Sequence, residues 1–458
     1  WLADYREHVA ELPVMPPVLP GGIRAQLPAA PPEAGESFDA VFADFARIVA
    51  PGITQWQSPN FYGYFPGGGS LSSVLGEFLG SGLASVGLSW QASPALTELE
   101  EVVTDWVRQM VGLSGAWSGV IQDTASTSTL VALLCARERA TDYGLVRGGL
   151  QAAGQPLTVY VTEHSHSSVN KAALLAGFGR ENVRIVAHDD AYAMRPDALR
   201  DAMARDVAEG RVPCAVVATT GTTAVTAMDP VRSMVEVARE FGAWVHVDAA
   251  MAGTAMVIQE LRWMWDGVEG ADSVVLNPHK WMGVVMDCSL YYVRDAEHLV
   301  RVMSTNPSYL RSAVDAQVKN YRDWGIPLGR RFRALKLWFH VRDQGVEGVR
   351  ARVRRDMENA RWLEAQVRAT PGWRVVAPVP LQTVCVRHEP PGLSGDALDA
   401  HTQAWVGRVM ESGQAYITAG TLDGRWMVRV SIGSENTERA HVVATWAVMR
   451  EAAESYAP

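Results

Sequence analysis

The sequence is poor in cysteine, and its few cysteines lie far apart. The four residues Cys135, Cys214, Cys288 and Cys385 form no CxxC pair and show no metal-ligand spacing. Scattered thiols are typical of a reducing, cytoplasmic compartment, so we expect no disulfide framework. The histidines and aspartates also lack HExxH or Cys/His spacing, and no metal site is predicted.

Positive charge and long apolar runs are also scarce. The chain has 41 Lys and Arg against 50 Asp and Glu, a formal net charge of −9, which provides no basic surface for nucleic acid. No uninterrupted apolar segment reaches the roughly 18–20 residues that a membrane-spanning helix needs. No predicted strand leads into a GxGxxG loop, so no dinucleotide site is expected; Gly-Gly-Gly at 67–69 is a different and weaker signal.

What the sequence does contain is globular composition and an alternating pattern of elements. With 458 residues, 48% of them hydrophobic, the chain is long enough for more than one domain. From about residue 100, apolar strands alternate with helices of about 10–15 residues, which predicts an open, mainly parallel α/β sheet. The predicted strands are 157–164, 184–189, 212–221, 244–250, 273–279 and 288–295.

The two ends of the chain follow other patterns. Residues 1 to about 35 are rich in Pro and Gly, which indicates a linker or a segment that wraps a partner surface. After about residue 338 the helices and strands form an α+β pattern typical of a small C-terminal domain. We therefore predict three parts, residues 1–70, 71–337 and 338–458.

One helix of the central region has clear end signals. Its apolar residues recur at helical spacing between Asp229 and Gly242. This pattern predicts Asp229 as N-cap, Pro230 as the first helical residue and Gly242 as C-cap.

Polar residues gather where the predicted strands end, which is where open α/β sheets carry their functional groups. They are His164–His166, Thr219–Thr223, Asp248 and His279–Lys280. Each alone could be an ordinary solvated strand end, and the Ser/Thr cluster that opens the helix 123–140 could be simple N-capping. A helix N-terminus of that kind can also bind phosphate. A common explanation for all of them is therefore needed.

Lys280 supplies that explanation. It interrupts two apolar runs within Asn-Pro-His-Lys-Trp, and a buried ammonium is costly unless something compensates for its charge. An amine in a partly apolar pocket becomes a nucleophile for carbonyl groups. A lysine, an aspartate such as Asp248 for a pyridinium nitrogen, and a phosphate site are together what pyridoxal 5′-phosphate (PLP) requires.

The sequence resembles the group II PLP-dependent amino-acid decarboxylases, and within them the aromatic-L-amino-acid decarboxylases. The strings that carry the resemblance include SPNFYGYFP, SWQASPALTELE, GVIQDTASTSTLVALL, HSSVNKA, ATTGTT, HVDAAMAG, NPHKW, DCS, NPSYL and IPLGRRFRALKLW. They run in order from about residue 5 to about residue 450. The resemblance implies fold type I, with a mainly parallel seven-stranded sheet, and a homodimer with shared active sites. Residues 1–70 would pack across the partner subunit.

The resemblance also implies roles for particular residues. Lys280 would attach PLP covalently, Asp248 would pair with the pyridinium nitrogen, and His166 would stack on the ring and help to handle protons. Thr223 would lie near the ring. The phosphate would be held by Ala125, Ser126, Asn277 and His279.

Tyr309 of NPSYL resembles the tyrosine with which this family protonates the substrate carbon, in a loop (301–329) that closes over the partner's site. It could instead be an ordinary surface tyrosine. Related aldehyde synthases commonly carry Phe in place of this tyrosine or Asn in place of the histidine matched by His166. Both residues are intact here, which favours plain decarboxylation.

The family's substrate-side positions are mostly apolar here, which suits an aromatic side chain and disfavours glutamate. They are Trp56, Tyr64, Phe65, Pro66, Val86, Leu88, Leu328 and Gly329, and the same residues could be ordinary core or interface residues. Gly329 would leave space for an indole. Gly67 stands where the animal aromatic decarboxylases have a hydroxyl residue, and Leu88 stands where they have Phe. Both differences argue against dihydroxyphenylalanine as the preferred substrate and leave tryptophan or phenylalanine slightly ahead of tyrosine.

Three functions remain in competition. The first is decarboxylation of an aromatic L-amino acid to its amine and CO2. The second is an aldehyde synthase or another PLP enzyme on the same scaffold, and the third is a catalytically silent PLP-fold binding protein. Intact Lys280, Asp248, His166 and Tyr309 argue against the third.

Overall fold

The computed structural model describes residues 1–149, 154–305, 314–315 and 317–455. The chain divides into two compact units. The larger unit comprises residues 67–357 and 377–381, and the smaller unit comprises residues 1–66, 358–376 and 382–458. Within the described ranges, no helix combines the length and the apolar character that crossing a bilayer requires.

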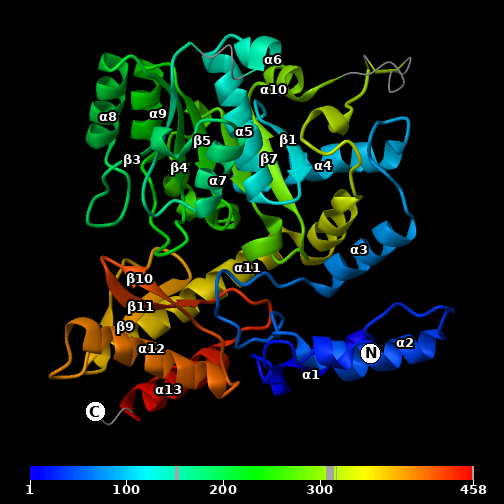
Figure 1. Ribbon diagram of the computed structural model, residues 1–458, viewed down its shortest axis with the longest axis vertical. Helices are drawn as coiled ribbons and strands as arrows, with labels where there is room; N and C mark the ends of the chain where they lie inside the picture. Colours follow the sequence, from blue (N-terminus) through cyan, green and yellow to red (C-terminus); the bar gives the residue numbers. More distant parts are fainter. Residues whose placement is uncertain (150–153, 306–313, 316, 456–458) are drawn as a thin grey trace. The chain divides into compact units, whose positions relative to one another are not determined.

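The larger unit is built on a seven-stranded sheet with the order β1-β7-β6-β5-β4-β2-β3 (Figure 1). Its strands are β1 (Ser118–Gln122), β2 (Leu157–Val161), β3 (Val183–Ile185), β4 (Val212–Thr219), β5 (Trp244–Asp248), β6 (Ser273–Leu276) and β7 (Ser289–Val293). Neighbouring strands from β3 to β6 are parallel, and β7 runs antiparallel to both β1 and β6. The predicted α/β fold with a mainly parallel sheet is confirmed. β1 has no counterpart among the predicted strands.

Alternate side chains of the strands face two layers of helices. Val159, Val161, Ala215 and Val217 share a buried cluster with residues of α5 (Ala125–Ala140), α7 (Ser167–Leu175) and α10 (Ala296–Met303). The intervening residue Tyr160 instead reaches Asp206 of α8 (Pro196–Ala208). Because side chains alternate along a strand, α8 lies on the opposite face of the sheet. The other main helices of this unit are α3 (Leu71–Gly82), α4 (Pro94–Val111), α6 (Gly144–Gly148), α9 (Val231–Glu240) and the first part of α11 (Arg333–Ala369).

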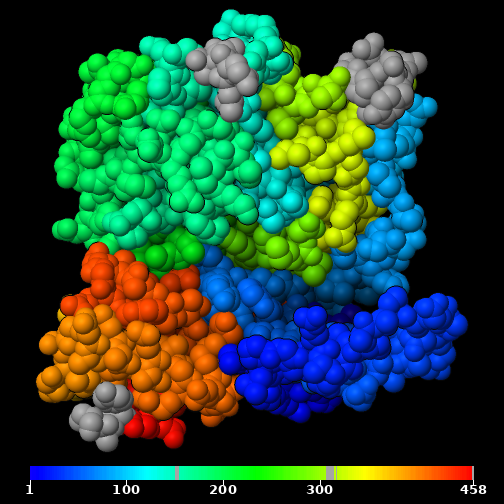
Figure 2. Space-filling model, viewed as in Figure 1, coloured from blue at the N-terminus to red at the C-terminus, as the bar shows by residue number. Residues whose placement is uncertain are grey.

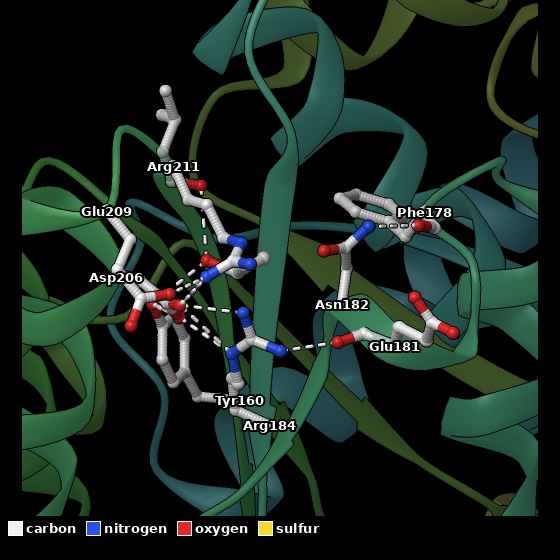
Figure 3. A network of polar contacts seen from close by, with 10 residues as sticks. Tyr160, Phe178, Glu181, Asn182, Arg184, Asp206, Glu209 and Arg211 are labelled. Atoms are coloured by element: carbon white, nitrogen blue, oxygen red, sulfur yellow. Dashed lines mark hydrogen bonds and ion pairs between the residues drawn. The ribbon is translucent and has the colours of Figure 1, made fainter.

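Asp206 joins the sheet edge to α8 through a buried network of polar contacts (Figure 3). Its carboxylate accepts a hydrogen bond from the Tyr160 hydroxyl at 2.7 Å and from the Arg184 Nη2 at 2.7 Å. Arg184 lies on β3 and Tyr160 on β2, so a single carboxylate ties two strands and one helix together. The Arg184 guanidinium and the Tyr160 hydroxyl hold the pKa of this carboxyl below its usual range, against the effect of burial.

The structure corrects the predicted ends of α9. Pro230 is the N-cap, Val231 opens the helix, and Phe241 is the C-cap, with Gly242 just beyond it at a φ of +69°. Asp229 does not cap the helix, because its carboxylate accepts the backbone N–H groups of Met194 and Thr219, both at 2.7 Å. The Asp229 side chain is buried, and its hydrogen bonds go to backbone N–H groups of two neighbouring segments instead of to the N–H groups of the helix end.

The smaller unit has an antiparallel sheet in the order β10-β11-β9-β8. Its elements are β8 (Trp373–Val375), β9 (Thr383–His388), β10 (Thr418–Leu422), β11 (Arg425–Ser431), α12 (Gly395–Glu411), α13 (Arg439–Glu454), and the N-terminal helices α1 (Leu2–His8) and α2 (Phe38–Asp44). The N-terminal segment packs within this unit: Tyr62 N donates to Tyr416 O at 2.8 Å, and Arg6 pairs with Glu435 at 3.2 Å.

Candidate active site

Asp248 lies at the carboxyl end of β5, between the ends of β4 and β6. It is in register with Thr219 on one side and Val275 on the other, and its carbonyl accepts the N–H of Thr220 at 2.9 Å. Its carboxylate accepts the N–H of Ala250 at 3.1 Å and is almost completely buried. A carboxylate in this position is suited to a cationic or N–H partner that approaches the edge of the sheet.

The first turn of α5 reaches the same edge of the sheet. Ala125 packs in a small buried cluster with Ala250 and Val275, so the helix begins directly beside the ends of β5 and β6. The N-cap residue Thr124 makes no side-chain capping hydrogen bond, and Ser126 is exposed. The first N–H groups of the helix, together with the Ser126 hydroxyl, form a suitable site for a phosphate group.

Lys280 lies in the short helical turn η10 (Pro278–Met282), where its φ of −104° and ψ of −118° interrupt the helical backbone. The side chain is half-buried. Asn277 precedes the turn, and its backbone N–H donates to Ala250 O at 2.9 Å, which links the turn to the residues that follow Asp248. The Asn277 side-chain oxygen is buried and has no hydrogen-bond partner among the described residues, so it is available to a bound group.

His279 presents a neutral ring beside Lys280. Its Nδ1 accepts the backbone N–H of Cys288 at 2.9 Å, which leaves the proton on Nε2 as a donor. Burial, together with the positive charge of Lys280, lowers the pKa of His279 to about 4. The ring therefore stays neutral at physiological pH and can donate a hydrogen bond to an anion.

His166 is the N-cap of α7, and its ring is close enough to Lys280 and Asp248 to respond to both charges. Its Nδ1 accepts the N–H of Ser168 at 3.2 Å. Burial and then the charge of Lys280 lower the pKa of His166, while Asp248 acts in the opposite direction. The three residues predicted to surround a cofactor therefore share one electrostatic neighbourhood.

The Gly-Gly-Gly segment packs directly against the lysine turn. A Cβ atom at Gly67 would lie 2.9 Å from the carbonyl oxygen of His279, and one at Gly69 would lie 2.9 Å from Cβ of Val285. Only glycine fits such close approaches without a shift of its neighbours. The segment therefore has a packing function that the sequence analysis did not recognise.

Two residues of α11 support the turn that carries Lys280, and neither is among the site residues predicted from the sequence. Asp356 accepts the indole N–H of Trp281 at 2.9 Å, and Arg352 donates to the carbonyl oxygens of Trp281, at 2.9 Å, and Met282. Both charged side chains are buried. They lie more than 70 residues from Lys280 on an unremarkable helix, so no local sequence signal identifies them.

Replacing Arg352 with alanine is expected to lower the free energy of unfolding by about 2–4 kcal/mol, because two buried carbonyl groups lose their charged donor. Chemical denaturation measures the change. Arg354→Ala is the matched control: Arg354 is half-exposed, lies 4.0 Å from Glu260, and its loss should change stability by less than about 0.5 kcal/mol. Equal losses in the two variants would show that Arg352 does not support the turn.

Lys280 is also the lysine best placed for a nucleophilic role. The sequence contains four lysines. Lys171 is exposed, Lys319 pairs with Glu101 at 3.4 Å on the surface, and Lys336 is fully buried beside Glu77 at 2.9 Å. Of the four, Lys280 is the one at the carboxyl edge of the sheet beside a carboxylate.

The predicted substrate residues form two groups. In the larger unit, Val86 lies within 3.7 Å of the position of a Cβ on Gly329, and the N–H of Gly87 donates to Arg330 O at 2.8 Å. Leu328 is exposed and Leu88 is half-buried. These contacts bring the 86–88 and 328–330 segments together.

In the smaller unit, Trp56 stacks on Tyr64 with their ring centroids 5.6 Å apart and an interplanar angle of 7°. Phe65 and Pro66 follow and are buried. Thr223 is half-buried in the turn after β4. Tyr309 lies outside the described residues.

The side chains at this edge fit PLP. Asp248 ends β5, His166 caps the helix that follows β2, the half-buried Lys280 lies in the turn after β6, and the N-terminus of α5 offers N–H groups to a phosphate. The small residues Ala125 and Ala250 leave steric room beside the first turn of α5, at the phosphate end.

Comparison with known proteins gives the same assignment. Residues 20–389 match the family profile described as the pyridoxal-dependent decarboxylase conserved domain. Phenylacetaldehyde synthase of Arabidopsis thaliana is 38% identical over 99% of this chain and 94% of its own length. Tryptophan decarboxylase 2 of Oryza sativa is 37% identical, with 99% and 92% covered.

Solved structures agree. Catharanthus roseus tryptophan decarboxylase in complex with L-tryptophan superimposes with a TM-score of 0.92 at 36% identity, covering 99% of this chain and 96% of that one. Rhodiola rosea 4-hydroxyphenylacetaldehyde synthase gives a TM-score of 0.91 at 34% identity, covering 100% and 96%. With the family profile spanning most of the chain and relatives matching it from end to end, this protein belongs to the pyridoxal-dependent decarboxylases, a family whose cofactor is PLP.

Proposed function

We propose that this protein decarboxylates aromatic L-amino acids to the corresponding aryl-alkyl amine and CO2. The observation that carries the proposal is the placement of His166, Asp248 and Lys280 at or just after the carboxyl ends of the parallel strands β2, β5 and β6, on one edge of the sheet. The names of the relatives given above refer to aromatic compounds. Tyrosine decarboxylase 4 of Petroselinum crispum, which is 39% identical to this chain, is a further relative with an aromatic substrate in its name.

Each residue of the site has a proposed task. Lys280 would hold PLP covalently. Asp248 would pair with the ring nitrogen and keep it protonated, and His166 would stack on the cofactor ring. Bound PLP supplies an electron sink for the electron pair left when CO2 departs.

The remaining cofactor residues position the phosphate. The backbone N–H groups of Ala125 and Ser126 in the first turn of α5, the Asn277 amide and the Nε2–H of His279 would donate to it, and Thr223 would lie near the ring. Because His279 is neutral, it adds a donor without adding another buried charge beside Lys280.

The apolar character of the proposed substrate residues supports an aromatic side chain. Trp56 and Tyr64 are exposed and stack in the smaller unit, and Val86, Leu328 and Gly329 are exposed in the larger unit. None of the five carries a positive charge that would pair with the side-chain carboxylate of glutamate. Tryptophan and phenylalanine are the substrates we favour.

The decisive assay is CO2 release from each aromatic L-amino acid by the PLP-loaded enzyme, with the organic product identified. Amine in equal amount to CO2 is the expected result. Aldehyde together with peroxide and ammonia would favour the aldehyde synthase, which two relatives represent. No CO2 from any aromatic amino acid would contradict both activities.

In the presence of O2 as the oxidant, replacing Tyr309 with phenylalanine is expected to divert much of the product from amine to aldehyde, with peroxide and ammonia as the other products. The phenol, with an ordinary pKa near ~10, is the proposed proton donor to the substrate Cα, and phenylalanine cannot deliver that proton. Product analysis by chromatography measures the ratio of amine to aldehyde. Tyr143→Phe, which removes a hydroxyl bonded to His298 at 2.6 Å, is the control and should leave that ratio unchanged. Amine formation by Tyr309→Phe at the original rate would exclude this proton donor.

We further propose a homodimer, which the exposed apolar surface of each unit supports. On α3, Leu71, Leu75, Phe78 and Leu79 recur at helical spacing and are all exposed; Phe78 is 73% exposed. In the smaller unit the N-terminal segment, blue in Figure 2, carries Leu19 at 82% and Phe38 at 77% exposure. Burial of these surfaces against a second copy would remove them from water.

Light scattering should give a mass about twice the 49.8 kDa of the chain. Phe78→Glu is expected to shift the protein towards monomer, because a carboxylate would be buried in the apolar interface. Trp263→Glu is the matched control, since Trp263 is also exposed but lies outside this stripe. A monomeric wild-type protein would contradict the dimer.

The four cysteines are unpaired and buried, and this supports a reducing, cytoplasmic compartment.

A further inference from the structure

The carboxyl ends of β2 and β3 bring a second group of polar side chains together, beside the candidate active site. The two strands are parallel neighbours, with Val161 in register with Ile185, and Val186 N donates to Val161 O at 2.8 Å. Glu163 and His164 follow β2, and His188 follows β3. Since both strands end at the same edge, the three side chains emerge side by side.

Their donor atoms converge on one point. Nε2 of His188 lies 3.0 Å from Oε1 of Glu163, and Nε2 of His164 lies 3.9 Å from the same oxygen. One ligand atom from each residue lies within 4.8 Å of the other two. A tetrahedral ion with bonds of about 2.0–2.2 Å separates its ligand atoms by roughly 3.3 Å. The two separations from Glu163 differ from this value by about 0.3 and 0.6 Å, and side-chain rotations that bring the two imidazoles closer together would bring all three ligand atoms to a common ion.

A backbone hydrogen bond orients the ring of His188. Its Nδ1 lies 2.8 Å from the carbonyl oxygen of Asp189, which can only accept, so Nδ1 carries a proton. Nε2 then points towards the Glu163 carboxylate, 3.0 Å away, and its lone pair is available to a cation held between the two side chains. A histidine whose outer N–H is bound by a carbonyl is the usual arrangement of a metal ligand.

The ligands are also held in place before any ion binds. The turn after His188 is closed by the Asp189 carboxylate, which accepts the N–H groups of Ala191 at 2.9 Å and Ala193 at 3.0 Å. The ring of Tyr192 packs edge-on against His164, with centroids 5.0 Å apart, and lies 5.3 Å from the ring of His188. Fixed rings reduce the entropy lost on binding.

We propose that Glu163, His164 and His188 bind one divalent transition-metal ion, with water completing the coordination. Two imidazole nitrogens and one carboxylate favour Zn²⁺ and similar ions over Mg²⁺ or Ca²⁺, which prefer oxygen ligands. The Glu163 side chain is 62% exposed, so the ion can exchange with solvent. The bound ion ties the end of β3 to the β2–α7 loop, which carries His166 two residues after His164. The site does not depend on the proposed decarboxylase activity.

The test measures Zn²⁺ binding to the tag-free, PLP-loaded protein after treatment with a chelator, by competition with a chromophoric chelator. One Zn²⁺ per chain is expected. His188→Ala and Glu163→Gln are each expected to weaken binding at least about tenfold, since each removes one of three protein ligands. The matched control is His8→Ala: His8 is an exposed histidine 3.4 Å from the carboxylate of Asp4, with no third ligand among the residues that the structure describes, and its loss should leave Zn²⁺ affinity unchanged.

Unchanged cofactor absorbance per chain establishes that each variant is folded, and Co²⁺ in place of Zn²⁺ gives visible bands that report the coordination geometry. His164→Gln, which keeps a polar side chain, is the second variant and should also lower affinity. Binding of less than one Zn²⁺ per chain by the wild type, or wild-type affinity in the folded variants, would overturn the site. The His188–Glu163 contact would then be an ion pair of a protonated imidazole.

Discussion

Lys280→Ala is expected to abolish decarboxylation, with a loss of at least about 10⁴-fold in kcat, which corresponds to about 5.5 kcal/mol of transition-state stabilisation. An alanine has no amine with which to hold PLP or to release the product. The other lysines cannot substitute, because Lys336 is fully buried beside Glu77, and Lys171 and Lys319 lie on the surface.

The measurement combines CO2 release with a test of covalent attachment. Borohydride reduction should fix PLP to the Lys280 peptide of the wild type and to no peptide of the variant, as detected by mass spectrometry. Lys171→Ala is the matched control and should retain both turnover and attachment, since Lys171 is exposed on α7. Cofactor fixed to any other lysine in the wild type would contradict the assignment.

Asp248→Asn should lower kcat by about 10²–10³-fold while leaving the protein folded. The amide keeps the size of the side chain and can still accept the N–H of Ala250, but it has no charge with which to hold a proton on the ring nitrogen. The loss of a buried, charge-assisted hydrogen bond of this kind costs about 3–4 kcal/mol. Because the effect is on the reacting group, kcat should fall more than KM rises.

Steady-state kinetics and the unfolding free energy are measured on the same preparations. Asp266→Asn is the control: Asp266 is exposed, pairs with Arg232 away from the site, and its loss should leave kcat unchanged. Asp248→Glu tests distance, because the charge is kept but moved, and it should recover part of the activity of the asparagine variant. An asparagine variant within tenfold of the wild-type kcat would exclude the proposed pairing.

The strands of the sheet could be predicted in outline because each produces a pattern within a short stretch of sequence. Apolar runs such as 212–221 and 244–250, separated by amphipathic helices, indicate buried parallel strands by their period and length alone. The direction of β7 was not predicted. It follows from the 12 residues between β6 and β7, which form no crossover helix, so the next strand returns antiparallel. β1 was missed because its apolar core is only two residues long, Val120 and Ile121.

The failed prediction at Asp229 has the same origin as the missed supports of the lysine turn. An aspartate that precedes a proline and an amphipathic helix predicts an N-cap from the local sequence. In the fold, the Asp229 carboxylate accepts the backbone N–H groups of Met194 and Thr219 instead. Likewise, the spacing between Trp281 and Asp356 carries no information until α11 lies against the turn. Hydrogen bonds between distant segments depend on tertiary packing, which local propensity does not encode.

By itself, the sequence determined the α/β class, the strand ends at which His166, Asp248 and Lys280 lie, and, through its motifs, the family. These properties depend on periodicity and on residue types within short windows. Only the tertiary structure decided which side chains meet. It placed Arg352 and Asp356 behind the lysine turn, required glycine at Gly67, and joined Glu163 and His164 to His188 across two strands. The sequence argued against any metal site because it showed no ligand spacing, whereas parallel strands bring together residues that are about 25 positions apart.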